Sequence, residues 1–384
     1  MHRSFDKFST RTIWIVATLL VGVITAVVAW SFINTNSVGS YSREQPNNPV
    51  NNNNGDISGN SNQETKAIVP LDQIVSGGPP RDGIPSIDNP KFVSVQDASK
   101  FLQDADLVIG LSINRETRAY PLQIMVWHEI VNDQLGNTPV AITYCPLCFT
   151  SQVFVRDIDG QVVQFGTSGK LYNSNLVMYD RTSNSLWSQA LGEGIVGKYA
   201  GKKLEKIPFE LAYWHDWKRL YPDSKVLSID TGFGRPYGTD PYGDYYRSSQ
   251  LVFPVSHHDD RLGLKEVVIG LEHGGTFKAY KLQDLEDKGA INDEINGNAI
   301  SLFSPYSFVV RAFDRTIDGQ TLDFAYDFHT KKIKDIQTGS EWNFDGLAVD
   351  GKMQGKKLSR LPFDEGFWFS WVAFHPQTEV YSVG

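Results

Sequence analysis

The sequence is poor in three features, and each shortage excludes a class of protein. Only two of its 384 residues are cysteine, Cys145 and Cys148, which excludes a fold held together by several disulfides. Acidic residues outnumber basic ones by 44 to 36, so the net charge is −8 and no nucleic-acid partner is expected. Apolar residues are scarce over 33–66, where Asn, Ser, Gly and Pro prevail, and this stretch is expected to be a disordered linker.

One long apolar run precedes that linker. Ile13–Phe32 carries no charge and is long enough to cross a bilayer as a helix. Arg3, Lys7 and Arg11 stand before it, and positive charge stays on the cytoplasmic side. We therefore expect a single-pass anchor at 13–32 that binds the cell membrane, with residues 1–12 inside and the globular part outside. The alternative is a cleaved signal peptide and a secreted protein.

The rest of the chain repeats itself. Val108–Leu111 returns as Val268–Leu271, and Asn132-Asp133 returns as Asn292-Asp293. Further matches in the same order are Ala119-Tyr120 with Ala279-Tyr280, Asp159-Gly160-Gln161 with Asp318-Gly319-Gln320, Trp187 with Trp342, Pro208-Phe209 with Pro362-Phe363, and Trp214 and Trp217 with Trp368 and Trp371. This pattern predicts a first repeat at 67–230, a Gly/Tyr/Asp-rich connector at 231–264 and a second, degenerate repeat at 265–384.

Within each repeat, short runs of Val, Ile, Phe and Tyr alternate with Gly, Asp and Asn, which is typical of strands and turns. The expected strands include Leu107–Ile113, Val140–Tyr144, Gln152–Asp157, Val162–Gly166 and Leu176–Asp180. Helices are expected at Pro121–Asn132 and Phe209–Tyr221 from a leading Pro and from helical spacing of aromatic residues. The predicted fold class is α+β, mainly β, with two tandem pseudo-repeats and short helices.

The sharpest chemical signal is the segment Thr143–Cys148, which contains the motif Cys-Pro-Leu-Cys after an expected strand. The second repeat has Phe303–Tyr306 in its place and lacks both cysteines. Two thiolates so spaced can bind a soft metal, cycle as a redox dithiol, or form a small structural disulfide. The metal interpretation adds His128 and Met178, also unmatched in the second repeat, and this ligand set suits copper better than zinc.

Other residues of the first repeat are weaker candidates. Ser168, in Phe165–Lys170, is a distant candidate for catalysis beside the two cysteines, although no activating base is evident. Tyr179, Asp180 and Arg181 are candidates for cofactor binding, and a local ion pair or turn is the alternative. The aromatic connector at 231–264 packs on both repeats or binds a small ligand or an exported partner.

The strings TYCPLC, FGTSGKL and MYDRTSNSLWSQ together resemble an uncharacterised prokaryotic family, domain of unknown function thirty-one seventy-nine. The likeness runs from about Leu71 to the C-terminus. Family members are typically exported or anchored, which the resemblance implies here also. It implies as signature positions Cys145, Cys148, Ser168, Gly169, Met178, Asp180, Arg181 and Trp187. The family has no established activity, so the resemblance sharpens the site and not the reaction.

Together these observations predict an extracytoplasmic protein that binds metal, copper before zinc, or performs thiol redox chemistry at Cys145 and Cys148. The sequence leaves open whether it is an enzyme; an oxidoreductase and a metal-handling protein are the two options. The alternative function is a non-catalytic cell-surface binding module that uses the connector.

Overall fold

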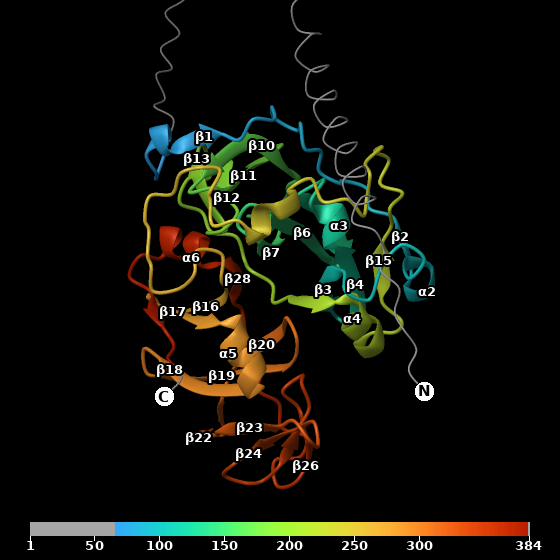
Figure 1. Ribbon diagram of the computed structural model, residues 1–384, viewed down its shortest axis with the longest axis vertical. Coiled ribbons are helices and arrows are strands. Elements are labelled where there is room, and N and C mark those ends of the chain that lie inside the picture. The colour runs from blue at the N-terminus through green and yellow to red at the C-terminus, as the bar shows by residue number, and fades with distance from the viewer. Residues whose placement is uncertain (1–65, 383–384) are drawn as a thin grey trace, which may run out of the picture. The chain divides into compact units, whose positions relative to one another are not determined.

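A computed structural model describes residues 66–382, which form a mainly β protein with a few short helices (Figure 1). The mainly β, α+β class predicted from the sequence is confirmed. The predicted anchor and linker, and the cytoplasmic segment before them, lie outside the described residues. Within 66–382, no helix has both the length and the apolar character needed to cross a bilayer.

The first half of the structure comprises the elements before residue 230. Its helical turns are η1 (Leu71–Gln73), α2 (Val95–Ala98), α3 (Leu122–Met125) and α4 (Trp214–Leu220). Its strands are β1 (Ile74–Ser76), β2 (Phe92–Ser94), β3 (Leu107–Ile113), β4 (Glu116–Pro121), β5 (Ile130–Leu135), β6 (Thr138–Cys145), β7 (Thr150–Val155), β8 (Asp157–Ile158), β9 (Gln161–Val162), β10 (Phe165–Tyr172), β11 (Asn175–Asp180), β12 (Leu186–Ser188), β13 (Glu193–Val196), β14 (Glu210–Tyr213) and β15 (Lys225–Leu227).

The second half follows the connector, which contains η2 (Gly243–Arg247). Its helices are α5 (Leu282–Lys288) and α6 (Trp368–Phe374). Its strands are β16 (Val267–His273), β17 (Thr276–Lys281), β18 (Ala290–Ile295), β19 (Asn298–Tyr306), β20 (Val309–Asp314), β21 (Thr316–Ile317), β22 (Gln320–Thr321), β23 (Phe324–Asp327), β24 (Lys332–Asp335), β25 (Glu341–Trp342), β26 (Ala348–Asp350), β27 (Ser359–Leu361), β28 (Asp364–Phe367) and β29 (Glu379–Val380).

The halves share one sheet. Strands β5, β6 and β7 of the first half continue into β28, β16, β17 and β29 of the second, in the order β29-β17-β16-β28-β7-β6-β5. The join is the antiparallel pair β28 and β7, where Glu365 stands opposite Ser151. The close approach depends on Gly366, because a Cβ there would lie 2.5 Å from the Thr150 side chain. A second contact between the halves brings β14 against β20, where Arg311 forms an ion pair with Glu210.

Strand registers correspond between the halves. The β3–β4 hairpin pairs Val108 with Pro121, and the β16–β17 hairpin pairs Val268 with Lys281, with six residue pairs in each hairpin. In both halves this hairpin is followed by a helix and then by three consecutive strands, β5, β6 and β7 in the first and β18, β19 and β20 in the second, although α5 is longer than α3. The duplication itself stays a prediction, which these matching registers support.

Buried polar contacts also correspond. Trp217 donates its indole N–H to Ser224 over 2.8 Å, and Trp371 donates to Thr378 over the same distance. Likewise the hydroxyls of Tyr120 and Tyr280 donate to Asp133 and Asp293, over 2.6 and 2.8 Å. Within each half, the same pairs of residues therefore satisfy one another's buried polar atoms, as the fold requires.

Two helix predictions were wrong in extent. The segment Pro121–Asn132 is helical only over α3, and its last residues belong to strand β5. In Phe209–Tyr221, helix α4 begins only at Trp214, after strand β14 has paired with β3. The leading Pro121 and the aromatic spacing of 209–221 each indicated a helix that exists in part, but pairing with another strand took the rest of each segment. By contrast, β3 has the bounds predicted for it.

Candidate functional site

Cys145 is the last residue of β6, and Cys148 lies in the turn that joins β6 to β7. Cys148 N donates to Cys145 O over 3.2 Å, and both thiols are free and buried, with 1% and 0% of each residue exposed. Cys148 Sγ donates to the carbonyl of Ser174 over 3.1 Å. Burial first, and then a hydrogen bond with Cys148, raise the pKa of Cys145 well above its usual value. At rest, the thiol of Cys145 is therefore protonated.

The second half reaches this turn directly. Phe367 N, at the end of β28, donates to Cys148 O over 2.8 Å. The ring of Phe149, which follows the motif, stacks on the ring of Phe367 with centroids 5.3 Å apart. The environment of the cysteines is thus built by both halves, although only one half supplies the thiols.

Glu129 occupies an unusual backbone position beside the motif. It ends the turn after α3 with a left-handed φ of 59°, its N–H donates to Met125 O over 2.7 Å, and its carbonyl accepts from Tyr144 N over 2.8 Å. The second half makes the same turn with Gly289, whose φ is 69°. Gly289 N and O form the matching bonds over 2.7 and 2.8 Å. Glycine is free of Cβ strain in this conformation, and glutamate is not.

The Glu129 carboxyl is an acid held in an apolar place. Burial, followed by the nearby sulfur of Cys145, raises its pKa well above the ordinary value. Within residues 66–382, no hydrogen bond reaches its side chain, and the residue is 7% exposed. Strained backbone together with a perturbed buried acid is typical of functional sites. Glu129 is therefore the strongest single candidate that the structure adds.

Glu129 also lines a hollow of about 410 Å³ next to the cysteine turn. Leu147, between the two cysteines, lines the same hollow, and so do Tyr242, Tyr245 and Phe253 of the connector. Tyr245 Oη donates to Leu147 O over 2.8 Å, which ties the connector to the motif. A hollow of this size with mainly apolar walls suits a small molecule.

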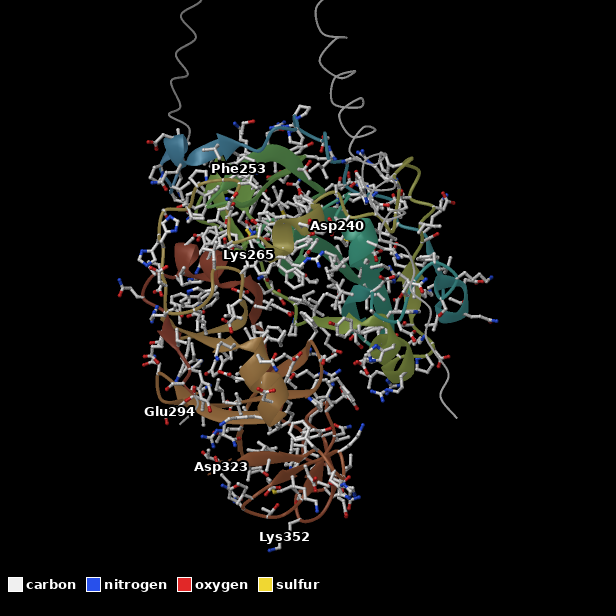
Figure 2. The ribbon with its side chains drawn as sticks, in the orientation of Figure 1. Asp240, Phe253, Lys265, Glu294, Asp323 and Lys352 are labelled. Carbon is white, nitrogen blue, oxygen red and sulfur yellow. The ribbon has the colours of Figure 1, made fainter. Side chains whose placement is uncertain are left out.

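The connector is itself held in place. In Figure 2 it can be followed from Asp240 through Phe253 to Lys265, the residue that follows it. Lys265 Nζ donates to the carbonyls of Tyr245 and Gln250, over 2.5 and 2.9 Å, and lies 3.3 Å from the centre of the Tyr245 ring. The predicted packing of connector aromatics is thus seen on the apolar cluster that contains the cysteines.

Three of the four predicted metal ligands share one apolar cluster, and the fourth makes contacts elsewhere. Met178 is buried in the same apolar cluster as Cys145 and Cys148. His128 instead uses both ring nitrogens elsewhere: Nδ1 is 2.7 Å from Pro85 O and Nε2 is 2.6 Å from Tyr237 Oη. Burial lowers the pKa of His128, so this ring is neutral at pH 7. In the described part of the chain, no group of three or more His, Cys, Asp or Glu side chains is arranged to hold a metal.

Ser168 is engaged by its own strand neighbours. Its Oγ donates to Val177 O over 2.5 Å and accepts from Lys170 N over 3.1 Å, at an irregularity in the pairing of β10 with β11. The hydrogen bonds found within 66–382 include none from a histidine or a carboxylate to this hydroxyl. This geometry gives Ser168 a structural role in the strand irregularity.

The trio Tyr179, Asp180 and Arg181 divides into two contacts. Tyr179 Oη and Arg181 Nη1 both bond to Asp82, over 2.5 and 2.8 Å, and burial raises the pKa of Tyr179 to about 12. Asp180 accepts the indole N–H of Trp187 over 3.0 Å. The second half has the same contact between Asp335 and Trp342, over 2.9 Å, so Asp180 belongs to the common framework.

Sequence reasoning missed Glu129, although a signal was present. The match of Asn132 with Asn292 places Glu129 opposite Gly289, three residues earlier in each half. A charged residue opposite a glycine at a helix end marks a position where one half carries backbone strain that the other avoids.

Comparison with known proteins gives a family and no function. A family model described as "Protein of unknown function (DUF3179)" matches residues 81–378. No curated protein matches the chain, and neither does any solved structure.

Proposed function

We propose that this chain, which belongs to the DUF3179 family, is a thiol–disulfide redox protein in which Cys145 and Cys148 are the reacting pair and Glu129 transfers the protons. One observation carries the proposal. A buried carboxyl without a hydrogen-bond partner in the described residues lies beside Cys145, in a backbone conformation for which the corresponding turn uses Gly289. The fold does not require this acid, so a chemical role accounts for it best.

The reaction begins with proton transfer. The Glu129 carboxylate takes the proton of Cys145, and the thiolate attacks one sulfur of a small bound disulfide, R–S–S–R′. The bond between Cys145 and R–S forms while R′–S⁻ leaves and receives the proton from Glu129. Cys148 then attacks Cys145 Sγ, its proton passing through the same carboxylate to the departing R–S⁻. The chain ends with one disulfide, and two small thiols are released.

The size of the substrate follows from burial. Both thiols are almost fully enclosed, and the hollow of about 410 Å³ beside them is lined by Glu129 and by connector rings. A small disulfide fits such a space, whereas a folded protein does not reach it without opening the connector. The apolar run Ile13–Phe32 supports an extracytoplasmic location, where disulfide chemistry persists.

The test is a redox titration of the purified full chain. The chain is equilibrated in buffers of graded thiol/disulfide ratio, quenched with acid and alkylated, and its mass is recorded. We expect one reversible two-electron transition that is absent in Cys145→Ser and in Cys148→Ser. Ser304→Ala, in strand β19 of the second half, which corresponds to β6, is the control and should titrate like the parent. A folded chain whose thiols never form a disulfide across the range sinks the proposal.

Glu129 is tested by rate. Glu129→Gln keeps the size of the side chain but cannot accept a proton, so reduction of a small disulfide at pH 7 should slow by about 10²-fold or more. The midpoint potential of the redox titration should change much less, because the substitution leaves the two reacting sulfur atoms the same in both oxidation states. An equal rate in parent and variant at every pH assigns Glu129 no part in proton transfer.

Capture of a soft metal is the second candidate, and Met178 is the observation that favours it. Two thiolates with a buried thioether nearby suit copper(I), and zinc less well. Elemental analysis of chain purified without chelators tests this: stoichiometric copper that disappears in a Cys145→Ser/Cys148→Ser double variant and declines in Met178→Leu supports it. Metal that survives in the double variant contradicts it.

A further inference from the structure

The two halves meet at two corresponding strand junctions, β28 with β7 and β14 with β20. The side chains at these two junctions differ. In the first half, Gln152 of β7 stands opposite Thr143 of β6; in the second, Arg311 of β20 stands opposite Phe303 of β19. Strand β6 pairs with β5 in the same register in which β19 pairs with β18. Gln152 and Arg311 therefore occupy the same position in their halves.

The strands that complete the junctions correspond in the same way. Glu210 of β14 pairs with Gly110, and Asp364 of β28 pairs with Gly270. Each glycine lies against the ring of a tryptophan, which a Cβ would enter at 1.9 and 2.3 Å respectively. Tyr221 and His375 directly follow the two tryptophan helices, and their N–H groups bond back to the tryptophan carbonyls over 2.8 and 2.9 Å.

The junction of β14 with β20 is filled. Arg311 donates from Nε and Nη2 to Glu210 Oε1 over 2.9 and 2.5 Å, and Arg360 lies 3.4 Å from the same oxygen. Tyr221 directs its hydroxyl to both carboxylate oxygens, each at 3.4 Å. Only 4% of the Glu210 side chain is exposed.

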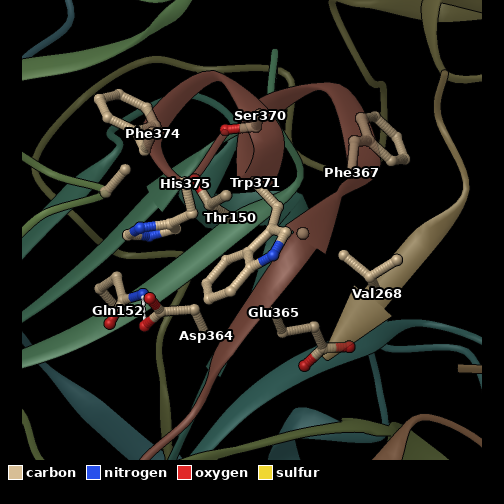
Figure 3. Close-up of a pocket in the computed structure, with 12 residues that line it drawn as sticks. Thr150, Gln152, Val268, Asp364, Glu365, Phe367, Ser370, Trp371, Phe374 and His375 are labelled. Carbon is tan, nitrogen blue, oxygen red and sulfur yellow. Dashed lines mark hydrogen bonds between the residues drawn. The ribbon is translucent and has the colours of Figure 1, made fainter. Parts of the chain in front are cut away.

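The junction of β28 with β7 has a smaller or shorter side chain at each of these positions. Asp364 replaces Glu210, Gln152 replaces Arg311, Lys206 replaces Arg360 and His375 replaces Tyr221. Gln152 Nε2 and Lys206 Nζ both donate to Asp364 Oδ1, over 2.6 and 2.5 Å, and within 66–382 no donor reaches Oδ2. Figure 3 shows Gln152 and Asp364 facing each other below His375.

The smaller side chains leave space. A hollow of about 630 Å³ opens here and is lined by Asp364 and His375, and 20% of the Asp364 side chain is exposed. Its walls include the aromatic side chains of Phe277, Phe363 and Phe374. The His375 ring stacks on Phe277 with centroids 4.1 Å apart. Volume, apolar walls and a few polar groups are the attributes of a ligand site.

We propose that this junction hollow binds a guanidinium group, which takes the place that Arg311 fills in the corresponding junction. The group donates to Asp364 Oδ2, the carboxylate oxygen without a described donor, and lies against the aromatic walls. Guanidinium suits both surfaces, because it bonds to carboxylates through paired N–H groups and stacks on rings. Lys203, Glu193 and Glu272 also line the hollow, so acidic groups outnumber basic ones around the bound cation once Lys206 has paired with Asp364.

Calorimetric titration of the full chain with L-arginine tests the proposal. We expect saturable binding with a dissociation constant on the order of 1 mM, as befits a small ligand. L-Citrulline, a neutral molecule of nearly the same shape, should bind about tenfold or more weakly, since one charged hydrogen bond is lost. A peptide Ala-Arg-Ala is titrated in parallel: tighter binding than free arginine identifies a protein side chain as the source, and weaker binding identifies a small metabolite.

Two variants make the outcome decisive. Gln152→Arg should pair with Asp364 in the way Arg311 pairs with Glu210, raise the melting temperature and lower arginine affinity at least about tenfold. Asp364→Asn keeps the shape, removes the charge and should weaken arginine but not citrulline. Equal binding of arginine and citrulline, unchanged affinity in Gln152→Arg, or no saturable binding overturns the proposal. The redox titration of Cys145 and Cys148 is unaffected by either variant, so this site succeeds or fails independently.

Discussion

Replacing Glu129 with glycine should make the protein more stable and less active at the same time. The substitution copies Gly289, which has the same backbone conformation and the same two backbone bonds in the second half. Relief of left-handed strain contributes roughly 1–2 kcal/mol. Loss of two buried methylene groups costs about 1.6 kcal/mol. These terms nearly cancel, so below the unfolded pKa of a glutamate the free energy of unfolding should change little.

The pH dependence then separates this explanation from simple repacking. The pKa of Glu129 is raised in the folded state, so the parent gains stability from this group at low pH and loses it as pH rises from the unfolded pKa toward the folded one. The loss is at most about 1.4 kcal/mol per pH unit. Glu129→Gly lacks the titrating group, so its stability advantage over the parent should grow as the pH rises toward 7.

Urea unfolding of parent and variant from pH 4.5 to pH 8 measures this difference. Glu129→Gln is the control, because it keeps the strain and the packing but has no titrating group. Its stability relative to the parent should change with pH in the same way as that of Glu129→Gly. A Glu129→Gly chain that is less stable than the parent at pH 7, or a difference that stays constant with pH, would refute the account of Glu129 as a strained and buried acid.

Three further predictions concern the surrounding structure. Gly289→Ala should lower the free energy of unfolding by about 1–3 kcal/mol in urea titration, because φ is 69° and a Cβ would lie 2.3 Å from the Tyr326 ring. Gly136→Ala is the control: its φ is also positive but the space at its Cβ is open, so it measures the backbone strain without the clash. Tyr245→Phe removes the bond to Leu147 and should speed alkylation of the native cysteines about fivefold or more, since a hydrogen bond of roughly 1 kcal/mol no longer holds the connector; an unchanged rate contradicts a covering role. Arg311→Met should destabilise by about 3–5 kcal/mol by leaving Glu210 buried without its main partner, whereas Arg247→Met, an exposed pair, should have almost no effect in the same thermal melt.

Local pattern was sufficient for much of the fold. Alternation of apolar and turn residues predicted β3 with its observed bounds, and the motif strings identified the family that the comparison then showed. The strand predicted to end at Tyr144 extends by one residue into the Cys-Pro-Leu-Cys segment, which otherwise follows it as predicted. These features depend on residues close together in the chain, which periodicity and spacing describe well.

Helix ends and ligand sets were less accessible. A leading proline predicted a helix over Pro121–Asn132, but the chain turns at Glu129 and pairs as strand β5. His128 was grouped with the cysteines because both are absent from the second half, yet its ring bonds to Pro85 and Tyr237. A difference between the halves identifies unusual residues without telling which of them meet in space.

The amino-acid sequence by itself thus determined the family, the mainly β class and the position of the two thiols, since each is written in short segments. Only the tertiary structure placed Glu129 against Cys145 and brought β28 beside β7, where Glu365 stands opposite Ser151. The physical reason is that strand pairing between distant segments is selected by the burial and packing of the whole sheet, and no local period encodes the partner. The unequal filling of the two junctions follows from that pairing, because Gln152 and Arg311 become comparable only once both sheets are formed.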